Sequence, residues 1–138
     1  MLARQAESST LAAKLAPKPG KPNWPEYQAL CADIFDYLFS PPLKKGIRES
    51  RNISSVNRRD IITPNYAKKG FWLYVREKYW ADHVVIDAKN YTSQVSKDQV
   101  LQLANYLSTH GLGRFGILAT RNGASKSSQL VRREQTTN

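Results

Sequence analysis

Apolar side chains between residues 24 and 39 recur every three or four positions, at Tyr27, Leu30, Cys31, Ile34 and Leu38. This spacing predicts an amphipathic helix with one buried face. Asn23 suits the helix cap and Pro25 suits the first turn. Pro41 and Pro42 cannot continue a helix. We therefore expect the helix to span the segment from about residue 24 to residue 39.

The pattern changes to that of a strand over 83–89, HVVIDAK, where β-branched residues are frequent. Helical spacing returns at 96–111, where Ser96 suits the cap and Gly111 suits the stop. A second apolar strand follows at 114–120, RFGILAT. Two buried strands joined by a helix predict a parallel pair connected by a right-handed crossover.

Two segments before this unit are less regular. Residues 55–63 predict a strand that ends at a turn formed by Pro64 and Asn65. The segment 71–80, FWLYVREKYW, fits either a helix or a strand, and a short helix is favoured. Four of its rings are suited to stacking on bases or to packing against the sheet edge, and packing is favoured: Trp72, Tyr74, Tyr79 and Trp80.

Residues 125–135 begin a last helix, with Ser125 or Asn122 as its cap. Helices and strands thus alternate along much of the chain, which predicts an α/β domain. The length of 138 residues and the hydrophobic content of 41% suit one domain with a core. Residues 1–22 predict a flexible basic leader, and residues 23–138 the domain. We expect no membrane partner, because no apolar run approaches the roughly 18 residues of a membrane span.

The chain is strongly basic, with 21 Lys and Arg against 11 Asp and Glu and a net charge of +10. Nucleic-acid phosphate is the natural partner of such a surface, although a merely basic protein is the alternative. The segment 44–59 is the strongest candidate to face DNA, and a solvated loop is its alternative. Its candidate contacts are Lys44, Lys45, Arg58 and Arg59.

A single cysteine, Cys31, excludes an internal disulfide, and its place in a helical apolar stripe predicts a buried, unreactive thiol. One cysteine and two histidines make a zinc site improbable. The cysteine content fits a reducing compartment, so a cytoplasmic location is expected.

The strand at 83–89 ends with two ions, Asp87 and Lys89. Residues two apart on a strand share a face, so both lie on one face, with Ile86 and Ala88 on the other. Ions are rarely buried unless they are paired, bound to metal or used. A strand-end salt bridge is one interpretation, and a functional site is the other, since ligands bind at this end of strands in open α/β sheets.

A second acid, Asp60, lies beside the apolar pair Ile61 and Ile62. If its strand is adjacent to that of Asp87, the two carboxylates converge and need a cation between them. Mg²⁺ fits, with Mn²⁺ as a substitute, because it is often held by one or two carboxylates and substrate phosphate. The backbone carbonyl of Ala88 is a further candidate ligand. Lys89 adds a positive charge where an attacking hydroxide forms.

At this point the residues resemble a known family. RRDII followed by IDAKN is similar to the PD-(D/E)xK nuclease superfamily, with Asp60 as its first acid and Asp87 and Lys89 as its (D/E)xK pair. Arg59 stands where the proline is usual. The resemblance implies a restriction-endonuclease-like fold, a mixed central β-sheet flanked by helices. It also implies a Mg²⁺-dependent endonuclease that hydrolyses DNA.

The helix after the motif strengthens the resemblance. Its QLANY segment matches a QxxxY pattern, which puts Gln102 and Tyr106 on one helical face. In such nucleases the Gln supports the site and the Tyr contacts DNA, with Gln99 as a rival for the former role. The segment from about residue 57 to residue 122 resembles Mrr-like restriction endonuclease domains. Many members carry an acid on the first helix, for which Glu26 is the nearest candidate, but Gln28 is an alternative occupant of that position.

Three functions follow. Cleavage of DNA in restriction or phage defence is the first, with repair and an RNA substrate left open. A catalytically inactive nuclease-like module that binds nucleic acid is the second, and a small interaction domain with structural acids is the third. Relatives in this family continue with a strand and a closing helix. We therefore expect a domain truncated at its C-terminus, or one completed by a partner chain or by a second copy in a homodimer.

Overall fold

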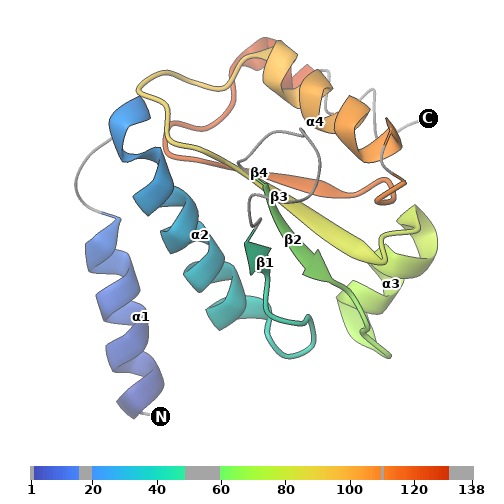
Figure 1. Ribbon diagram of the computed structural model, residues 1–138, viewed down its shortest axis with the longest axis horizontal. Helices are drawn as coiled ribbons and strands as arrows, with labels where there is room; N and C mark the ends of the chain where they lie inside the picture. Colours follow the sequence, from blue (N-terminus) through green and yellow to red (C-terminus); the bar gives the residue numbers. More distant parts are fainter. Residues whose placement is uncertain (1, 16–19, 49–59, 110, 131–138) are drawn as a thin grey trace.

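The structure is a computed structural model that describes residues 2–15, 20–48, 60–109 and 111–130 (Figure 1). Its helices are α1 (Leu2–Lys14), α2 (Trp24–Phe39), α3 (Gly70–Tyr79) and α4 (Lys97–Thr109), with a short 3₁₀ helix, η1 (Lys21–Asn23), before α2. Its strands are β1 (Ile47–Arg48), β2 (Asp60–Pro64), β3 (His83–Lys89) and β4 (Gly116–Thr120). Residues 126–130 are also helical.

The four strands form one mixed sheet in the order β1-β2-β3-β4. β1, β2 and β3 are antiparallel neighbours, while β3 and β4 are parallel and are joined through α4. The parallel pair predicted from the two apolar runs is therefore confirmed. The mixed α/β class is confirmed with it.

Helices cover both faces of this sheet, and the alternation along β3 divides the core between them. On one face, Ile86 packs in a cluster with residues of α2 and α3, including Cys31 and Trp72. On the other face, Val85 packs with Leu103 and Leu107 of α4. Figure 1 shows α2 and α4 on opposite sides of the strands. β3 is thus the buried centre of the fold.

α2 has the bounds that its apolar spacing predicts, Trp24–Phe39. Pro25 lies in its first turn, and Asn23 occupies the cap position without a side-chain cap hydrogen bond. The stripe is buried at its start, around Tyr27 and Cys31, but its last member, Leu38, is exposed. The favoured helix at 71–80 is also confirmed, as α3.

The C-terminus of α4 and the N-terminus of the last helix each have a capping residue that the sequence predicted. The backbone N–H of Leu112 donates to the Leu107 carbonyl at 3.2 Å, while Gly111 takes a φ of +62°. This geometry closes α4 where glycine is favoured, because a Cβ is disfavoured at that φ. Of the two candidate caps for the last helix, Ser125 accepts from the Ser128 N–H at 3.3 Å.

Two predictions about local structure differ from the structure. Where a flexible leader was expected, Leu2–Lys14 form α1, which lies beside α2 and has no buried residue. The turn expected at Pro64 and Asn65 is not formed there. Pro64 is the last residue of β2, and Asn65, which follows it, is fully buried. The start of the predicted strand, 55–59, lies outside the described residues. No helix in the described ranges is both long enough and apolar enough to cross a membrane.

Candidate acid–lysine site at the end of β3

Asp87 and Lys89 form an ion pair at the C-terminal end of β3. The distance from Lys89 Nζ to Asp87 Oδ2 is 2.9 Å, and the two side chains are 8% and 7% exposed, respectively. The pair forms because alternate residues of a strand share a face. Its burial follows from the position of β3 between two other strands and two helical layers.

Asp60 lies directly opposite Asp87 in the antiparallel register of β2 and β3. Opposite positions on such a pair lie on the same face of the sheet, with Cβ atoms about 4.5–5.5 Å apart in general. The condition on which the sequence prediction depended, adjacency of the two acidic strands, is therefore confirmed. Asp60 begins β2, so the acidic positions meet where the described part of this strand starts.

The surroundings of the ion pair on the α4 side are largely apolar. Asp87 is aligned with Leu118 on β4, and Lys89 is aligned with Thr120. Leu118 and the half-buried Tyr106 both pack against the cluster of Val85, Leu103 and Leu107. Attraction between charges is stronger in such a low-dielectric layer than in water.

Ala88 separates the two ions along the strand and packs on the other face. Its side chain is buried in the cluster that includes Ile86 and Val84. This is the packing that strand alternation predicts for a residue between two functional side chains. A metal-binding role for its carbonyl stays a prediction.

The QxxxY helix is present, but its two glutamines occupy different environments. Gln99 Oε1 accepts hydrogen bonds from the Ser96 N–H and the Ser96 hydroxyl, both at 2.6 Å, so it serves as part of the α4 cap. Gln102 is exposed on α4. Tyr106 is half-buried against the core, which is the packing alternative left open from sequence. The structure thus brings together Asp87 and Lys89 but leaves Gln102 in solvent.

Basic candidates Lys44 and Lys45 are exposed just after α2. The Lys44 N–H donates to the Pro64 carbonyl at 3.1 Å, which places this segment at the end of β2 opposite to Asp60. Arg58 and Arg59 lie outside the described residues. Proximity of Lys44 and Lys45 to the acidic positions, expected from the sequence order, is therefore not observed.

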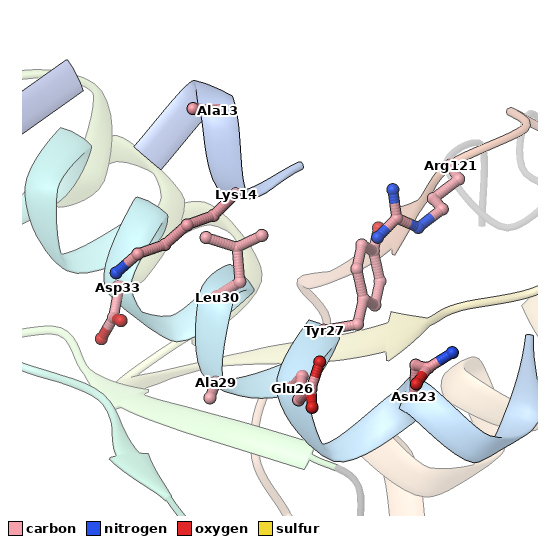
Figure 2. Close-up of a pocket in the computed structure, with 9 residues that line it drawn as sticks. All are labelled: Ala13, Lys14, Asn23, Glu26, Tyr27, Ala29, Leu30, Asp33 and Arg121. Carbon is pink, nitrogen blue, oxygen red and sulfur yellow. The ribbon is translucent and has the colours of Figure 1, made fainter. Parts of the chain in front are cut away.

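Glu26, the candidate for the acid that many relatives carry on their first helix, does not lie beside the ion pair. Glu26 lies on α2, whose buried residues pack on the face of the sheet opposite to that of Asp87. It lines a cavity of about 440 Å³ together with residues of α1 and α2 and with Arg121. Figure 2 shows Glu26 beside Tyr27 in this cavity, with Lys14 extended towards Asp33. Gln28, the alternative occupant, is half-buried on the same helix.

A polar connection at the ends of the two parallel strands was missed by sequence reasoning. Arg121, the residue after β4, donates from Nε to Asn90 Oδ1 and from Nη1 to the Leu15 carbonyl. Asn90, the residue after β3, donates to the Gly20 carbonyl at 3.0 Å. The available signal was that both residues directly follow aligned strand ends, Lys89 and Thr120.

The same arginine covers the buried start of α2. Its guanidinium carbon lies 4.8 Å from the centre of the Tyr27 ring. Burial raises the pKa of the Tyr27 hydroxyl well above its usual range, and burial raises the pKa of the Cys31 thiol to about 11. The buried, unreactive cysteine predicted from the helical stripe is consistent with this shift, because the thiolate is the reactive form.

Metal-binding groups were sought among the side chains that the structure describes. Within those ranges, no group of three or more His, Cys, Asp and Glu residues is arranged to hold a metal ion. A site of two carboxylates, with water and phosphate as the other ligands, falls below that count. The donor set at Asp60 and Asp87 is oxygen only, which suits Mg²⁺ better than zinc.

Comparison with known proteins shows a similarity over part of the chain. Over 96 residues, the chain is 35% identical to the transposon gamma-delta 80.3 kDa protein of Escherichia coli (strain K12). The aligned region is 70% of this chain but only 13% of that protein, so the chain spans a small part of the relative's length. No family model matches the chain, and no solved structure matches it.

Proposed function

We propose that the protein is a metal-dependent phosphodiesterase that cleaves DNA, with a restriction-endonuclease-like fold. The observation that carries the proposal is the placement of Asp60 opposite Asp87 on adjacent strands. Lys89 adds a buried cation 2.9 Å from Asp87. Two acids on adjacent strands can hold a metal ion that activates water, and a lysine beside them can offset negative charge on the phosphate.

The burial of the ion pair supports a functional role. Desolvation of two charges costs several kcal/mol per ion, and their attraction often does no better than a packed apolar pair. A structural salt bridge between Asp87 and Lys89 would therefore contribute little net stability in this layer. Retention of both charges is better explained by chemistry than by packing.

Asp60 and Asp87 would hold Mg²⁺ through their carboxylates. The bound ion would supply an acidified water and offset negative charge on the phosphate. Lys89, whose Nζ lies 2.9 Å from Asp87 Oδ2, would supply an ammonium that donates to the phosphate. The same ammonium would stabilise charge that develops on the phosphate oxygens as the bond breaks. Tyr106, the DNA contact expected from the sequence, lies on α4, the helix that covers this face of the sheet.

A plasmid-nicking assay with and without Mg²⁺ or Mn²⁺ tests the proposal. We expect Asp87→Asn to lower the metal-dependent nicking rate by at least about 100-fold, because a neutral amide holds the ion poorly. Binding of DNA should survive the change. Asp82→Asn is the matched control, since Asp82 is 77% exposed in the turn before β3.

Two outcomes would count against the phosphodiesterase. One is an Asp87→Asn variant that nicks plasmid as fast as the wild type. The other is a folded wild-type protein that shows no metal-dependent nicking at all. Lys89→Ala, run in parallel, should lose nicking as fully as Asp87→Asn if both residues act in one site.

A nucleic-acid-binding module without cleavage is the second candidate. The observation that favours it is the closed ion pair, in which Lys89 is already 2.9 Å from the carboxylate that the metal needs, while Gln102 is exposed. Intact DNA binding with no nicking in either metal, and with no change on Asp87→Asn, would select this function.

A further inference from the structure

Exposed aromatic rings and cations alternate on α3 and on the turn that follows it. Phe71, Tyr74 and Trp80 are 60%, 49% and 62% exposed. Four exposed cations lie on α3, just before it or in the loop before β4: Lys68, Lys69, Lys78 and Arg114. We call these seven residues the α3 surface. The sequence analysis offered two roles for four rings, stacking on bases or packing against the sheet edge. Of these rings, Trp72 is buried and Tyr79 is half-buried, whereas Tyr74 and Trp80 are exposed to solvent.

Two of the exposed rings, Phe71 and Tyr74, contact buried or half-buried rings. Phe71 meets Trp72 edge-on, with centroids 5.1 Å apart, and meets Phe115 in the same way at 6.5 Å. Tyr74 meets the half-buried Tyr79 edge-on at 6.2 Å. Because these contacts already restrict the rings, a ligand that stacks on them loses less conformational freedom.

Trp80 and Arg114 form a pair that the backbone fixes in place. The guanidinium carbon of Arg114 lies 4.4 Å from the centre of the Trp80 ring. The Arg114 N–H donates to the Tyr79 carbonyl at 2.7 Å, which ties the loop before β4 to the end of α3. The approach is so close that a Cβ on Gly113 would lie 2.3 Å from the Trp80 carbonyl oxygen. The Arg114 guanidinium and the Trp80 indole ring are therefore exposed side by side.

Trp80 is an unfavourable choice for this position on structural grounds alone. It ends α3 with a φ of +51°, a left-handed conformation in which glycine or asparagine is usual. It also leaves a large ring in solvent. A residue kept against both preferences points to a role in binding.

The charges around the rings favour a polyanion. The Lys78 ammonium lies 5.4 Å from the centre of the Tyr74 ring, and Lys68 and Lys69 precede the helix. The acids nearby are Glu77, which is exposed, and Asp82, whose carboxylate lies 3.7 Å from Arg76. Cations thus remain in excess after this pairing. Flat apolar rings beside uncompensated cations match the bases and phosphates of an unpaired nucleic-acid strand.

We propose that the α3 surface binds single-stranded nucleic acid, with bases stacked on Trp80 and Tyr74 and phosphates on the neighbouring lysines. The proposal deepens the phosphodiesterase function by naming the form of the nucleic acid that it would cleave. That the bound strand is a substrate rests on the proposed phosphodiesterase function. Binding itself requires neither the metal nor the Asp87–Lys89 pair.

Fluorescence anisotropy of a labelled twenty-residue thymidine oligonucleotide in EDTA tests the proposal. We expect Trp80→Leu to weaken binding roughly 5- to 150-fold, the range for loss of one stacked base, because leucine keeps the apolar bulk and removes the π face. Trp80→Phe, which restores a ring, should stay within about threefold of the wild type. Ile47→Ala is the control, because Ile47 is exposed on the edge strand β1.

A blunt duplex of the same length should compete poorly and should bind equally to wild type and to Trp80→Leu. Wild-type affinity in Trp80→Leu would overturn the proposal and indicate an apolar docking surface for protein. Absence of oligonucleotide binding, or equal competition by duplex, would also overturn it. If the wild type does not nick plasmid but binds the oligonucleotide in a way that depends on Trp80, only the phosphodiesterase proposal is refuted. If it nicks plasmid but Trp80→Leu binds the oligonucleotide as tightly as the wild type, only the proposal for the α3 surface is refuted.

Discussion

Asp87 and Lys89 show how one pair of side chains can be costly for folding and still be kept. Each is buried beside apolar neighbours, so loss of either one would remove the 2.9 Å pairing of the other. Their separation by one alanine makes the pair visible in the sequence, because a strand puts alternate residues on one face. The depth of burial was less visible, since it depends on α4 and β4, which cover the strand.

Replacement of one member of the pair should therefore be more harmful than replacement of both. We expect Lys89→Met to lower the free energy of unfolding by about 3–5 kcal/mol, because it removes the buried ammonium that pairs with the Asp87 carboxylate. The double change Asp87→Leu with Lys89→Met should lie within about 1 kcal/mol of the wild type while abolishing nicking. Urea unfolding at pH 7 measures both. Equal loss of stability in the single and double variants would show that the pair itself stabilises the fold.

At the scale of elements, the sequence predicted those parts whose periodic pattern reflects one buried face. α2, β3 and α4 belong to this group, and so does the parallel pairing of β3 with β4. α1 was missed because it buries no side chain, so no apolar stripe marks it. β1 was missed because two residues are too few for a pattern. The adjacency of Asp60 and Asp87 needed the long-range register, for which the motif gave only an expectation.

Asn65 illustrates an element-scale contact that local pattern cannot supply. The sequence suggested a turn residue, but the side chain is fully buried and holds both ends of α3. Its Nδ2 donates to the carbonyls of Trp72 and Ala81 at 2.9 and 3.1 Å, and its Oδ1 accepts from the Ala67 N–H at 3.2 Å. Both distant carbonyls belong to residues that the fold alone brings near.

Removal of this amide should destabilise α3 against the sheet. We expect Asn65→Ala to lower the free energy of unfolding by about 3 kcal/mol, because three hydrogen bonds are lost and buried backbone groups are left without them. Tyr66→Ala, next to it but exposed, should cost less than about 0.5 kcal/mol. Thermal and urea unfolding of the two variants provide the comparison. A similar loss in both would mean that the amide network contributes little.

At the scale of the whole molecule, positive charge is the dominant property. The net charge of +10 is spread over the chain rather than confined to one segment, since Lys44 and Lys45 lie at one end of β2 and the cations of the α3 surface lie elsewhere. A surface of this kind binds phosphate through the release of counterions. Affinity for any nucleic acid should then depend strongly on salt.

We expect the dissociation constant for a DNA duplex to rise at least about 100-fold between 50 and 200 mM NaCl, as for proteins that contact several phosphates. Anisotropy titrations at four salt concentrations give the slope of the logarithm of affinity against the logarithm of salt concentration. The double change Lys44→Ala with Lys45→Ala should reduce the magnitude of this slope by up to about two. An affinity that does not change with salt would favour the small interaction domain with structural acids.

β3 also sets a distance. Its seven residues run from the end next to Trp80, at His83, to the end that carries Lys89. Six steps of about 3.3 Å separate those ends by about 20 Å. This length separates the surface proposed to bind a single strand from the site proposed to cleave DNA. An oligonucleotide that spans less than this length would reach only one of the two places, whereas a longer one would reach both.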